Sequence, residues 1–599
     1  MKGNWQARKR GSGAVVAVNV DVRGWTDGEI LRTSLSDALR MAIDPMWLAV
    51  LSKTIVWVWL EVPRMAMVRV CKAHLRWLAV ALAVGLFILP ACAQVTSERL
   101  LHADREPQNW LMYSGDYAGH RFSSLHEITV ANAEKLAPKW VYQTMAGGKF
   151  ETTPLVIDGI LYGTGQDDRA FALDARTGRP IWQYQRGLPS DIRPCCGRVN
   201  RGLAILGDKV FMGTLDSHVL ALDTKTGNVV WDVTAVDYTK GYSFTLAPLV
   251  IKDSVLVGVS GGEYGIRGFI DAYDANTGAR KWRFYTIPAP GEPGNDSWEG
   301  DSWKIGGSPA WITGTYDPET NTTFWTTGNP SPSNRGEGRA GDNLYSNSLL
   351  ALDPDTGKLK WHFQFTQHDE HDYDATQVPV MVNDGSNKLI LQANRNGFFY
   401  VIDRTNGKLL RADSYAKVSW SKDRDANGRP VPAKEGSPTP EGNKVCPGAA
   451  GATNWMSPTF DPQTKLFYVT AREQCDVFST APQPYEAGHA YYGSAYFPNE
   501  EAAPFYGALR AIDPVNGKIK WEWKHPSPTW SGVLSTAGGV VFTGDAEGNF
   551  IALDAATGKA LWHFQCGASV YSSPMTYAVG GKQFVAVAAG SSLFTFGLP

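Results

Sequence analysis

Seven segments of this 599-residue chain repeat one pattern of apolar and polar positions. Each has a short apolar run that ends in Asp, a turn containing Thr-Gly or Asn-Gly, and a second strand-like run that usually contains Trp. The Asp can hydrogen-bond the turn backbone and the Gly supplies a positive φ, so each segment predicts a β-hairpin. The segments are 172–182, 221–231, 272–282, 351–361, 401–410 (without the Trp), 511–521 and 552–562.

A further pair of strand-like runs precedes each hairpin, for example 154–162 and 538–545. Four short strands per unit, repeated every ~40–50 residues, are typical of a β-propeller. The repeated Trp is expected to pack flat between neighbouring blades. With 132–140 as a degenerate eighth member, the sequence predicts an all-β, eight-bladed propeller with tryptophan-docking repeats; seven blades is the nearest alternative. The longer gaps before Asp353 and Asp513 then hold insertions.

The composition agrees with a turn-rich β protein, since aromatic residues make up 12 % of the chain and there are 61 Gly. A net charge of −2 gives no electrostatic case for binding nucleic acid. The continuous repeat favours one closed domain over several.

Residues 1–64 lack the repeat, and we interpret them as an extension produced by a start site assigned too far upstream. A basic segment, the apolar run 77–89 and Ala91-Cys-Ala93 then predict a secretory signal peptide over 65–93, with the propeller occupying 94–599. Two alternatives stay open: a real extension followed by an uncleaved anchor, and a lipoprotein site at Cys92.

Export permits disulfides, and five cysteines follow the signal. Cys195 and Cys196 are adjacent, so a bond between them closes a strained ring of the kind found at ligand clamps; reduced thiols on opposite faces of a strand are the alternative. Cys446 and Cys475 could form an ordinary bridge, which leaves Cys566 as a buried thiol. The chain contains no Cys-x-x-Cys-His motif for attaching a haem.

The repeat, the Cys pair and three motifs at 260–267, 325–330 and 367–374 together resemble the pyrroloquinoline quinone (PQQ)-dependent alcohol dehydrogenases, the methanol- and ethanol-dehydrogenase large subunits. The resemblance covers about residue 100 to the C-terminus. It implies that PQQ lies near the propeller axis, between the Cys–Cys ring and a Trp plane, with a metal ion beside it.

By this resemblance Glu263 and Asn329 are metal ligands, and Asp372 is both a ligand and the catalytic base. Carboxylate and amide oxygens suit a hard cation. The family usually has Trp where His371 stands, so the local detail differs. His368 and His371 without thiolates are more typical of polar scaffolding than of a zinc site.

The residue type at position 374 distinguishes the calcium-using from the lanthanide-using members of the family. Family members that use calcium typically have a small residue two positions after the catalytic Asp, whereas lanthanide users have Asp, as here. A trivalent ion of similar radius needs one more negative oxygen, so we expect Asp374 to be a ligand of a lanthanide. Calcium is the alternative, and Asp374 could instead point away and cap a strand end.

The resemblance also assigns a set of residues to the quinone pocket. Trp311 would stack on the ring, while cationic and hydroxyl side chains would meet the three carboxylates of PQQ. Glu151, Thr245 and Asn454 are the members most easily explained as ordinary strand-end residues. The set is Glu151, Cys195, Cys196, Arg201, Thr245, Ser260, Gly261, Gly262, Trp311, Arg395, Asn454 and Trp530.

The expected function is therefore a periplasmic dehydrogenase that oxidises small primary alcohols and passes electrons to a separate, soluble cytochrome c. A PQQ-dependent sugar or polyol dehydrogenase is the enzymatic alternative. The non-enzymatic alternative is a propeller lipoprotein of outer-membrane assembly, but this alternative leaves the Cys pair and the carboxylates unexplained. A homodimer, a small second subunit and the preferred alcohol are left open.

Overall fold

The computed structural model describes residues 94–498 and 505–599, so the extension and signal peptide expected at 1–64 and 65–93 lie outside it. Gln94–Pro599 form one compact unit. Among the described residues, no helix combines the length and the apolar character that crossing a bilayer would require.

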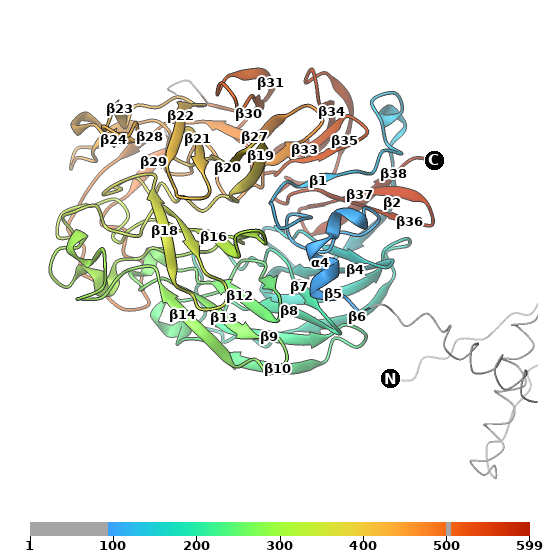
Figure 1. Cartoon of the computed structure of the whole chain (residues 1–599), viewed down its shortest axis with the longest axis horizontal. Coiled ribbons are helices and arrows are strands. Elements are labelled where there is room, and N and C mark those ends of the chain that lie inside the picture. The colour runs from blue at the N-terminus through green and yellow to red at the C-terminus, as the bar shows by residue number, and fades with distance from the viewer. Residues whose placement is uncertain (1–93, 499–504) are drawn as a thin grey trace, which may run out of the picture. The chain divides into compact units, whose positions relative to one another are not determined.

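Most of the described chain forms four-stranded antiparallel sheets. Figure 1 shows them following one another in chain order around a ring, and the all-β propeller prediction is confirmed. Five sheets use consecutive strands: β3 (Leu155–Ile157), β4 (Ile160–Gly165), β5 (Arg169–Asp174) and β6 (Pro180–Gln185); β7 (Ala204–Leu206), β8 (Lys209–Gly213), β9 (His218–Asp223) and β10 (Val229–Thr234); β11 (Leu249–Ile251), β12 (Ser254–Gly258), β13 (Phe269–Asp274) and β14 (Arg280–Tyr285); β15 (Thr315–Asp317), β16 (Thr322–Thr326), β17 (Ser348–Leu352) and β18 (Leu359–Gln364); β19 (Val380–Asp384), β20 (Asn387–Ala393), β21 (Phe398–Asp403) and β22 (Leu409–Ser414).

Three further sheets complete the ring, and the last of them joins the two ends of the propeller because β2 pairs with β38. The segment 132–140, predicted as a degenerate repeat, supplies the first residues of β2. The sheets are β26 (Thr459–Asp461), β27 (Leu466–Glu473), β30 (Tyr506–Ile512) and β31 (Ile519–His525); β1 (Phe122–Ser123), β32 (Leu534–Thr536), β33 (Val540–Gly544), β34 (Asn549–Asp554) and β35 (Ala560–Gln565); and β2 (Ala137–Gln143), β38 (Ser592–Gly597), β37 (Lys582–Ala589) and β36 (Met575–Val579).

The segments before Asp353 and Asp513 carry loops and small sheets outside the repeat. The small sheets are β23 (Ser421–Arg424) with β24 (Pro430–Pro432), and β25 (Asn443–Val445) with β28 (Asp476–Phe478) and β29 (Tyr496–Pro498). Helices are short: α4 (Ser97–Leu101) and the 3₁₀ turns η1 (Ala103–Arg105), η2 (Ala133–Lys135), η3 (Gln166–Asp168), η4 (Tyr238–Lys240), η5 (Gly262–Tyr264), η6 (Asn295–Ser297), η7 (Ser302–Ile305) and η8 (Lys434–Gly436).

The repeated hairpins form the two outer strands of their sheets, and the turn Asp has the expected role. Asp174 Oδ1 accepts hydrogen bonds from the backbone N–H groups of Arg176 and Thr177, at 3.0 and 2.8 Å. Gly178 in the same turn has a φ of +71°. A Cβ there would lie 2.6 Å from the Trp140 ring, so this Gly allows both the left-handed turn and the close approach of the indole.

The repeated Trp reaches from one sheet to the next. The indole N–H of Trp182 donates to the carbonyl of Thr224 at 2.8 Å, and that of Trp231 to Ala275 at 3.2 Å. In the repeat without Trp, Arg411 stands at the equivalent position and donates to the Asn516 carbonyl at 2.8 Å. A guanidinium thus replaces the indole as the donor to the next repeat.

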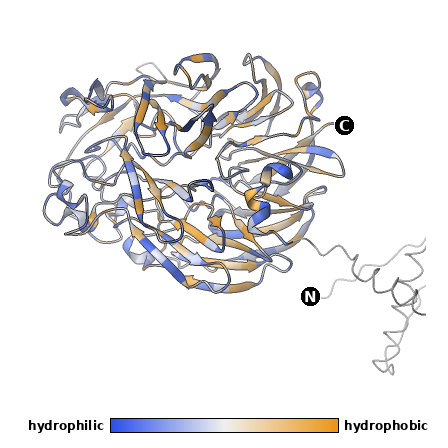
Figure 2. Cartoon of the chain, in the orientation of Figure 1, coloured by the Kyte–Doolittle hydropathy of each residue, from blue (hydrophilic) through white to orange (hydrophobic). Residues whose placement is uncertain are grey.

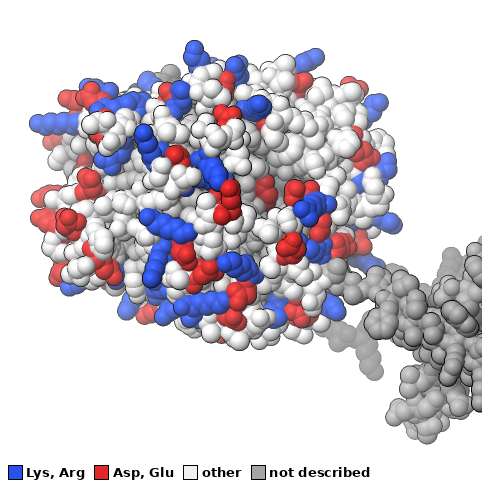
Figure 3. All heavy atoms as spheres, in the orientation of Figure 1, with Lys and Arg blue, Asp and Glu red and all other residues white. Residues whose placement is uncertain are grey.

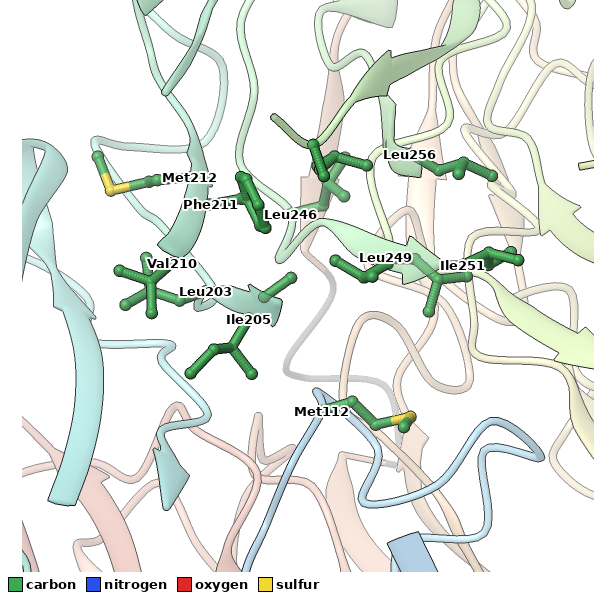
Figure 4. Close-up of a cluster of buried hydrophobic side chains, with 14 of the residues drawn as sticks. Met112, Leu203, Ile205, Val210, Phe211, Met212, Leu246, Leu249, Ile251 and Leu256 are labelled. Carbon is green, nitrogen blue, oxygen red and sulfur yellow. The ribbon is translucent and has the colours of Figure 1, made fainter. Parts of the chain in front are cut away.

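The core lies between neighbouring sheets. Inner strands such as β8 and β12 are almost fully buried, whereas outer strands such as β10 alternate between exposed and half-buried residues. Figure 2, coloured by hydropathy, shows polar and apolar residues mixed along the outer ribbons. Figure 4 shows Val210, Phe211 and Met212 in one of the buried clusters. Burying such side chains stabilises the fold by about 1.5–3 kcal/mol each. Charges of both signs are interspersed on the face drawn in Figure 3.

Candidate active site

Loops at the strand ends surround a cavity of about 350 Å³ that collects nearly all of the predicted site residues. Asn329 and Gly262 do not line it. The two lie beside each other, since a Cβ at Gly262 would sit 2.8 Å from Asn329 Oδ1. The predicted residues that line the cavity are Glu151, Cys195, Cys196, Arg201, Thr245, Ser260, Gly261, Glu263, Trp311, Asp372, Asp374, Arg395, Asn454 and Trp530.

The adjacent cysteines form a disulfide, with their Cα atoms 3.8 Å apart. Cys196 and Gly197 both have positive φ, at +67° and +111°, which lets the chain turn tightly at the ring. The two Sγ atoms and a carboxylate oxygen of Glu263 lie within 4.8 Å of one another. Because disulfide sulfurs are not thiolates, this grouping is no soft-metal site; it places the ring next to Glu263.

Glu263 is positioned by a loop that follows β12 and turns through η5. Gly261 begins the turn with a φ of +119°, and a Cβ there would meet the Gly241 carbonyl at 2.1 Å. The Glu263 carbonyl accepts a hydrogen bond of 2.6 Å from the Tyr491 N–H. Burial, together with the negative charge of Asp374, raises the pKa of the Glu263 carboxyl to about 7.

Asp374 points into the same region. Its Oδ1 accepts a hydrogen bond of 2.5 Å from the Asn329 N–H, and its Oδ2 lies 2.6 Å from Arg395 Nη1. Gly328 allows this approach, since a Cβ there would lie 2.2 Å from Asp374 Oδ1. Asn329 Oδ1 is buried and has no hydrogen-bond partner among the described residues. Asn329 therefore binds the Asp374 carboxylate through its backbone and keeps an unpartnered amide oxygen.

Asp372 lies on the other arm of the Arg395 guanidinium, with Oδ2 2.6 Å from Nη2. Its Oδ1 has no hydrogen-bond partner within the described part of the chain. Burial raises its pKa well above the usual range; Arg395 opposes this, and the charges of Asp374 and Glu263 add to it. The Arg395 guanidinium also donates to the carbonyl of Ala449.

Taken together, Glu263, Asp372, Asp374 and Asn329 offer three carboxylates and one unpartnered amide oxygen. Burial raises the pKa of all three carboxyls, while the nearby Arg395 guanidinium opposes this rise. Such an oxygen-rich set fits a hard di- or trivalent cation, and not a zinc or copper ion that prefers sulfur or imidazole. His368 and His371 instead face backbone carbonyls, at 2.9 and 2.7 Å.

A second cluster, around Arg201, lines the same cavity. Arg201 Nη2 is 2.7 Å from Glu151 Oε2, and Nη1 donates to Thr245 Oγ1 at 2.9 Å. The hydroxyls of Thr245 and Ser260 are 2.8 Å apart. The Arg201 guanidinium also lies 5.0 Å from the centre of the Trp311 ring. These groups offer a cation and hydroxyls next to an aromatic plane, a combination that fits a flat, anionic ligand.

Two parallel indoles close another wall, because Trp455 and Trp530 stack with ring centres 4.5 Å apart and planes at 8°. The Asn454 side chain is occupied by local bonds, since Nδ2 donates to the Ala450 carbonyl and Oδ1 accepts from the Trp455 N–H. It lines the cavity but has a structural role of its own.

Sequence reasoning did not include Lys149, Val199, Ala450 and Tyr496 in the site, although all four line the cavity. Lys149 stands two residues before Glu151 and lies over the rings of Trp455 and Tyr571, at 5.9 and 5.8 Å. This closeness in sequence to Glu151, a predicted site residue, is the signal that could have indicated Lys149. Tyr496 comes from an insertion without a repeat, and no sequence signal pointed to it.

The sequence was compared with models of known families. The model for the PQQ "Glucose/ethanol/alcohol dehydrogenase, beta-propeller domain" matches residues 110–422 and 502–585. The chain belongs to this PQQ dehydrogenase family.

Curated members of the family cover most of the chain. It is 40 % identical over 547 residues to the quinoprotein alcohol dehydrogenase PedH of Pseudomonas putida, covering 86 % of this chain and 91 % of that one. It is 36 % identical over 529 residues to a lanthanide-dependent methanol dehydrogenase of Methylacidiphilum fumariolicum, covering 82 % and 86 %. Among solved structures of this PQQ dehydrogenase family, a europium-containing methanol dehydrogenase superposes with a TM-score of 0.80 at 33 % identity, covering 84 % of this chain and all of that one.

Proposed function

We propose that this chain oxidises primary alcohols to aldehydes, with PQQ as the electron acceptor and a lanthanide as the metal. The observation that carries the proposal is the single cavity that brings together the vicinal disulfide, the aromatic walls and the carboxylates around Arg395. Membership of the PQQ dehydrogenase family and the names of its relatives support the reaction class.

The metal would be held by Glu263, Asn329, Asp372 and Asp374. Three carboxylates balance a trivalent ion better than a divalent one, and the additional Asp374 is the reason for preferring a lanthanide to calcium. The lanthanide-dependent relative and the europium-containing structure support this preference.

PQQ would lie between the disulfide and Trp311, with its carboxylates toward Arg201, Thr245 and Ser260. The backbone of Gly261 would admit it closely, with the predicted Gly262 next in the chain, and Glu151, Asn454 and Trp530 would close the pocket. When bound, PQQ supplies the two-electron acceptor for the hydride of the alcohol carbon.

Asp372 would take the proton of the alcohol hydroxyl. Its Oδ1 is unpartnered and available to a substrate, while Oδ2 is held by Arg395. The guanidinium favours the ionised carboxylate that a base requires, and it holds the side chain in one orientation. The side chains of Arg395 and Asp372 are 8 % and 16 % exposed, so the pair is largely shielded from solvent.

We infer that the sheets act as eight blades docked by tryptophans. Seven four-stranded sheets and one five-stranded sheet among the described residues support the number, and the indole contacts between successive repeats support the docking.

We further propose an exported, periplasmic enzyme, with an extension at 1–64, a signal peptide at 65–93 and the PQQ-binding propeller at 94–599. Because the chain has no haem-attachment motif, electrons would leave one at a time to a separate, soluble cytochrome c. A homodimer is compatible with this proposal.

Reconstitution tests the function. Purified full-length protein is loaded with PQQ and either lanthanum or calcium, and reduction of an artificial dye is followed with methanol, ethanol, longer alcohols, aldehydes, glucose and polyols. We expect bound PQQ in the absorption spectrum and fast turnover of primary alcohols only with PQQ and metal together. Faster turnover of sugars or polyols would favour the alternative dehydrogenase, and failure to bind PQQ would favour a non-catalytic propeller.

A further inference from the structure

Asp372 has an unusual backbone. Its φ is +62°, in the left-handed region that residues with a Cβ rarely adopt. Residues in this region persist where surrounding bonds over-determine them, and they cluster at functional sites. The structure must therefore contain groups that hold residue 372 in this conformation.

The side chain of Asp369 supplies these bonds. Its Oδ1 accepts a hydrogen bond of 3.0 Å from the N–H of His371, and its Oδ2 accepts one of 2.7 Å from the N–H of Tyr373. One carboxylate thus accepts hydrogen bonds from the backbone N–H groups of the two residues that flank Asp372. The Asp369 carboxylate is fully buried, so water does not compete for it.

Asp369 is itself held from two directions. Asn347 Nδ2 donates to Asp369 Oδ2 at 3.1 Å and to the Tyr373 carbonyl at 2.8 Å. The buried guanidinium of Arg339 donates to the Asp369 carbonyl. Arg339 also donates to Asn343 Oδ1 at 2.6 Å, which fixes it in turn.

We propose that Asp369 is a positioning residue: its two carboxylate oxygens bind the backbone on either side of Asp372 and fix the direction of the Asp372 side chain. This inference rests on the proposed function for the role of Asp372, and on observed bonds for the geometry. Asp369 does not line the cavity, so its effect on the site is exerted through residue 372. Without both bonds, residue 372 relaxes out of the left-handed region and its carboxylate moves away from Arg395 and Glu263.

The first test is Asp369→Asn, which keeps the volume but replaces one acceptor oxygen with a donor. Asp353→Asn is the matched control, because Asp353 Oδ1 also accepts two backbone N–H bonds, both of 3.0 Å, at an outer turn. Substituting groups that orient metal ligands typically costs about 10–100-fold in metal affinity or activity. We expect D369N to bind Tb³⁺ about tenfold more weakly and to lose at least tenfold in kcat with little change in KM. D353N should match the unsubstituted protein.

A double-mutant cycle separates positioning from general damage. Tb³⁺ affinity of the full-length protein, read by Trp-sensitised luminescence, is measured for D369N, Asp372→Asn and the double variant. If Asp369 acts through Asp372, D369N weakens Tb³⁺ binding only when Asp372 is present. Equal weakening in both backgrounds would overturn the proposal.

A crystal structure of D369N provides a readout that does not depend on the role of Asp372. A left-handed residue 372 in D369N would contradict the proposal even if Asp372 is the base. Activity retained in Asp372→Asn would instead contradict the proposed function alone. If D369N does not fold, Asn347→Gly serves in its place, because residue 347 has a φ of +49° that suits Gly. This variant should lose Tb³⁺ affinity and kcat in the same direction as D369N, but by a smaller factor.

Discussion

Replacing Asp372 with Asn is expected to abolish alcohol oxidation while PQQ stays bound. The amide cannot take the hydroxyl proton, and a positioned general base contributes about 10²–10⁴-fold to rate. The substitution also removes one of the proposed metal ligands and the ion pair of 2.6 Å with Arg395. We expect kcat to fall by about three orders of magnitude or more, measured by dye reduction with PQQ and lanthanum in excess.

Two controls show whether the loss of activity in D372N comes from loss of the base. PQQ content, read from the absorption spectrum, must equal that of the unsubstituted protein. Asp353→Asn, at an outer turn, must retain full activity. More than a tenth of the original kcat in D372N would remove the assignment of Asp372 as the base.

Replacing Asp374 with Ala is expected to remove lanthanide-supported activity selectively. Asp374 supplies one of the three carboxylates, and its loss should weaken La³⁺ binding by about 10–100-fold while calcium is affected less. Asp374→Asn is the matched variant, because it keeps an oxygen donor and removes only the charge. Unchanged kinetics with both metals would show that Asp374 is not a ligand.

The pH dependence of metal binding gives a second readout for this variant. Glu263 must lose its proton to bind a cation, and its pKa is about 7, through burial and through the charge of Asp374. Below about pH 7, protonation of Glu263 should therefore weaken Tb³⁺ binding to the unsubstituted protein. In D374A, the pKa of Glu263 falls, so this weakening should begin at lower pH; titrations of Tb³⁺ at a series of pH values measure this.

Much of the fold could be predicted because the repeat encodes it locally. The Asp and Gly of each turn specify a hairpin, as at Asp174 and Gly178, and the period of the repeat specifies the propeller. The sequence did not reveal that Arg411 replaces the missing indole, since the contact depends on carbonyls of the next repeat.

The site was predictable where a motif carries it and less so elsewhere. Glu263 and Asp374 stand in short motifs, and the fold brings these motifs to one cavity. Tyr496 reaches the cavity from an insertion, and the role of Asp369 depends on backbone hydrogen bonds that residue type alone does not encode. Asn454 matched a family contact, yet its side chain bonds locally.

Anomalous X-ray diffraction from crystals of the protein loaded with PQQ and a lanthanide would locate the metal without reference to activity. We expect one strong anomalous peak in the cavity, beside bound PQQ and in contact with oxygens of Glu263, Asn329, Asp372 and Asp374. A peak elsewhere, or an ion there that touches neither Glu263 nor Asn329, would contradict the proposed metal site.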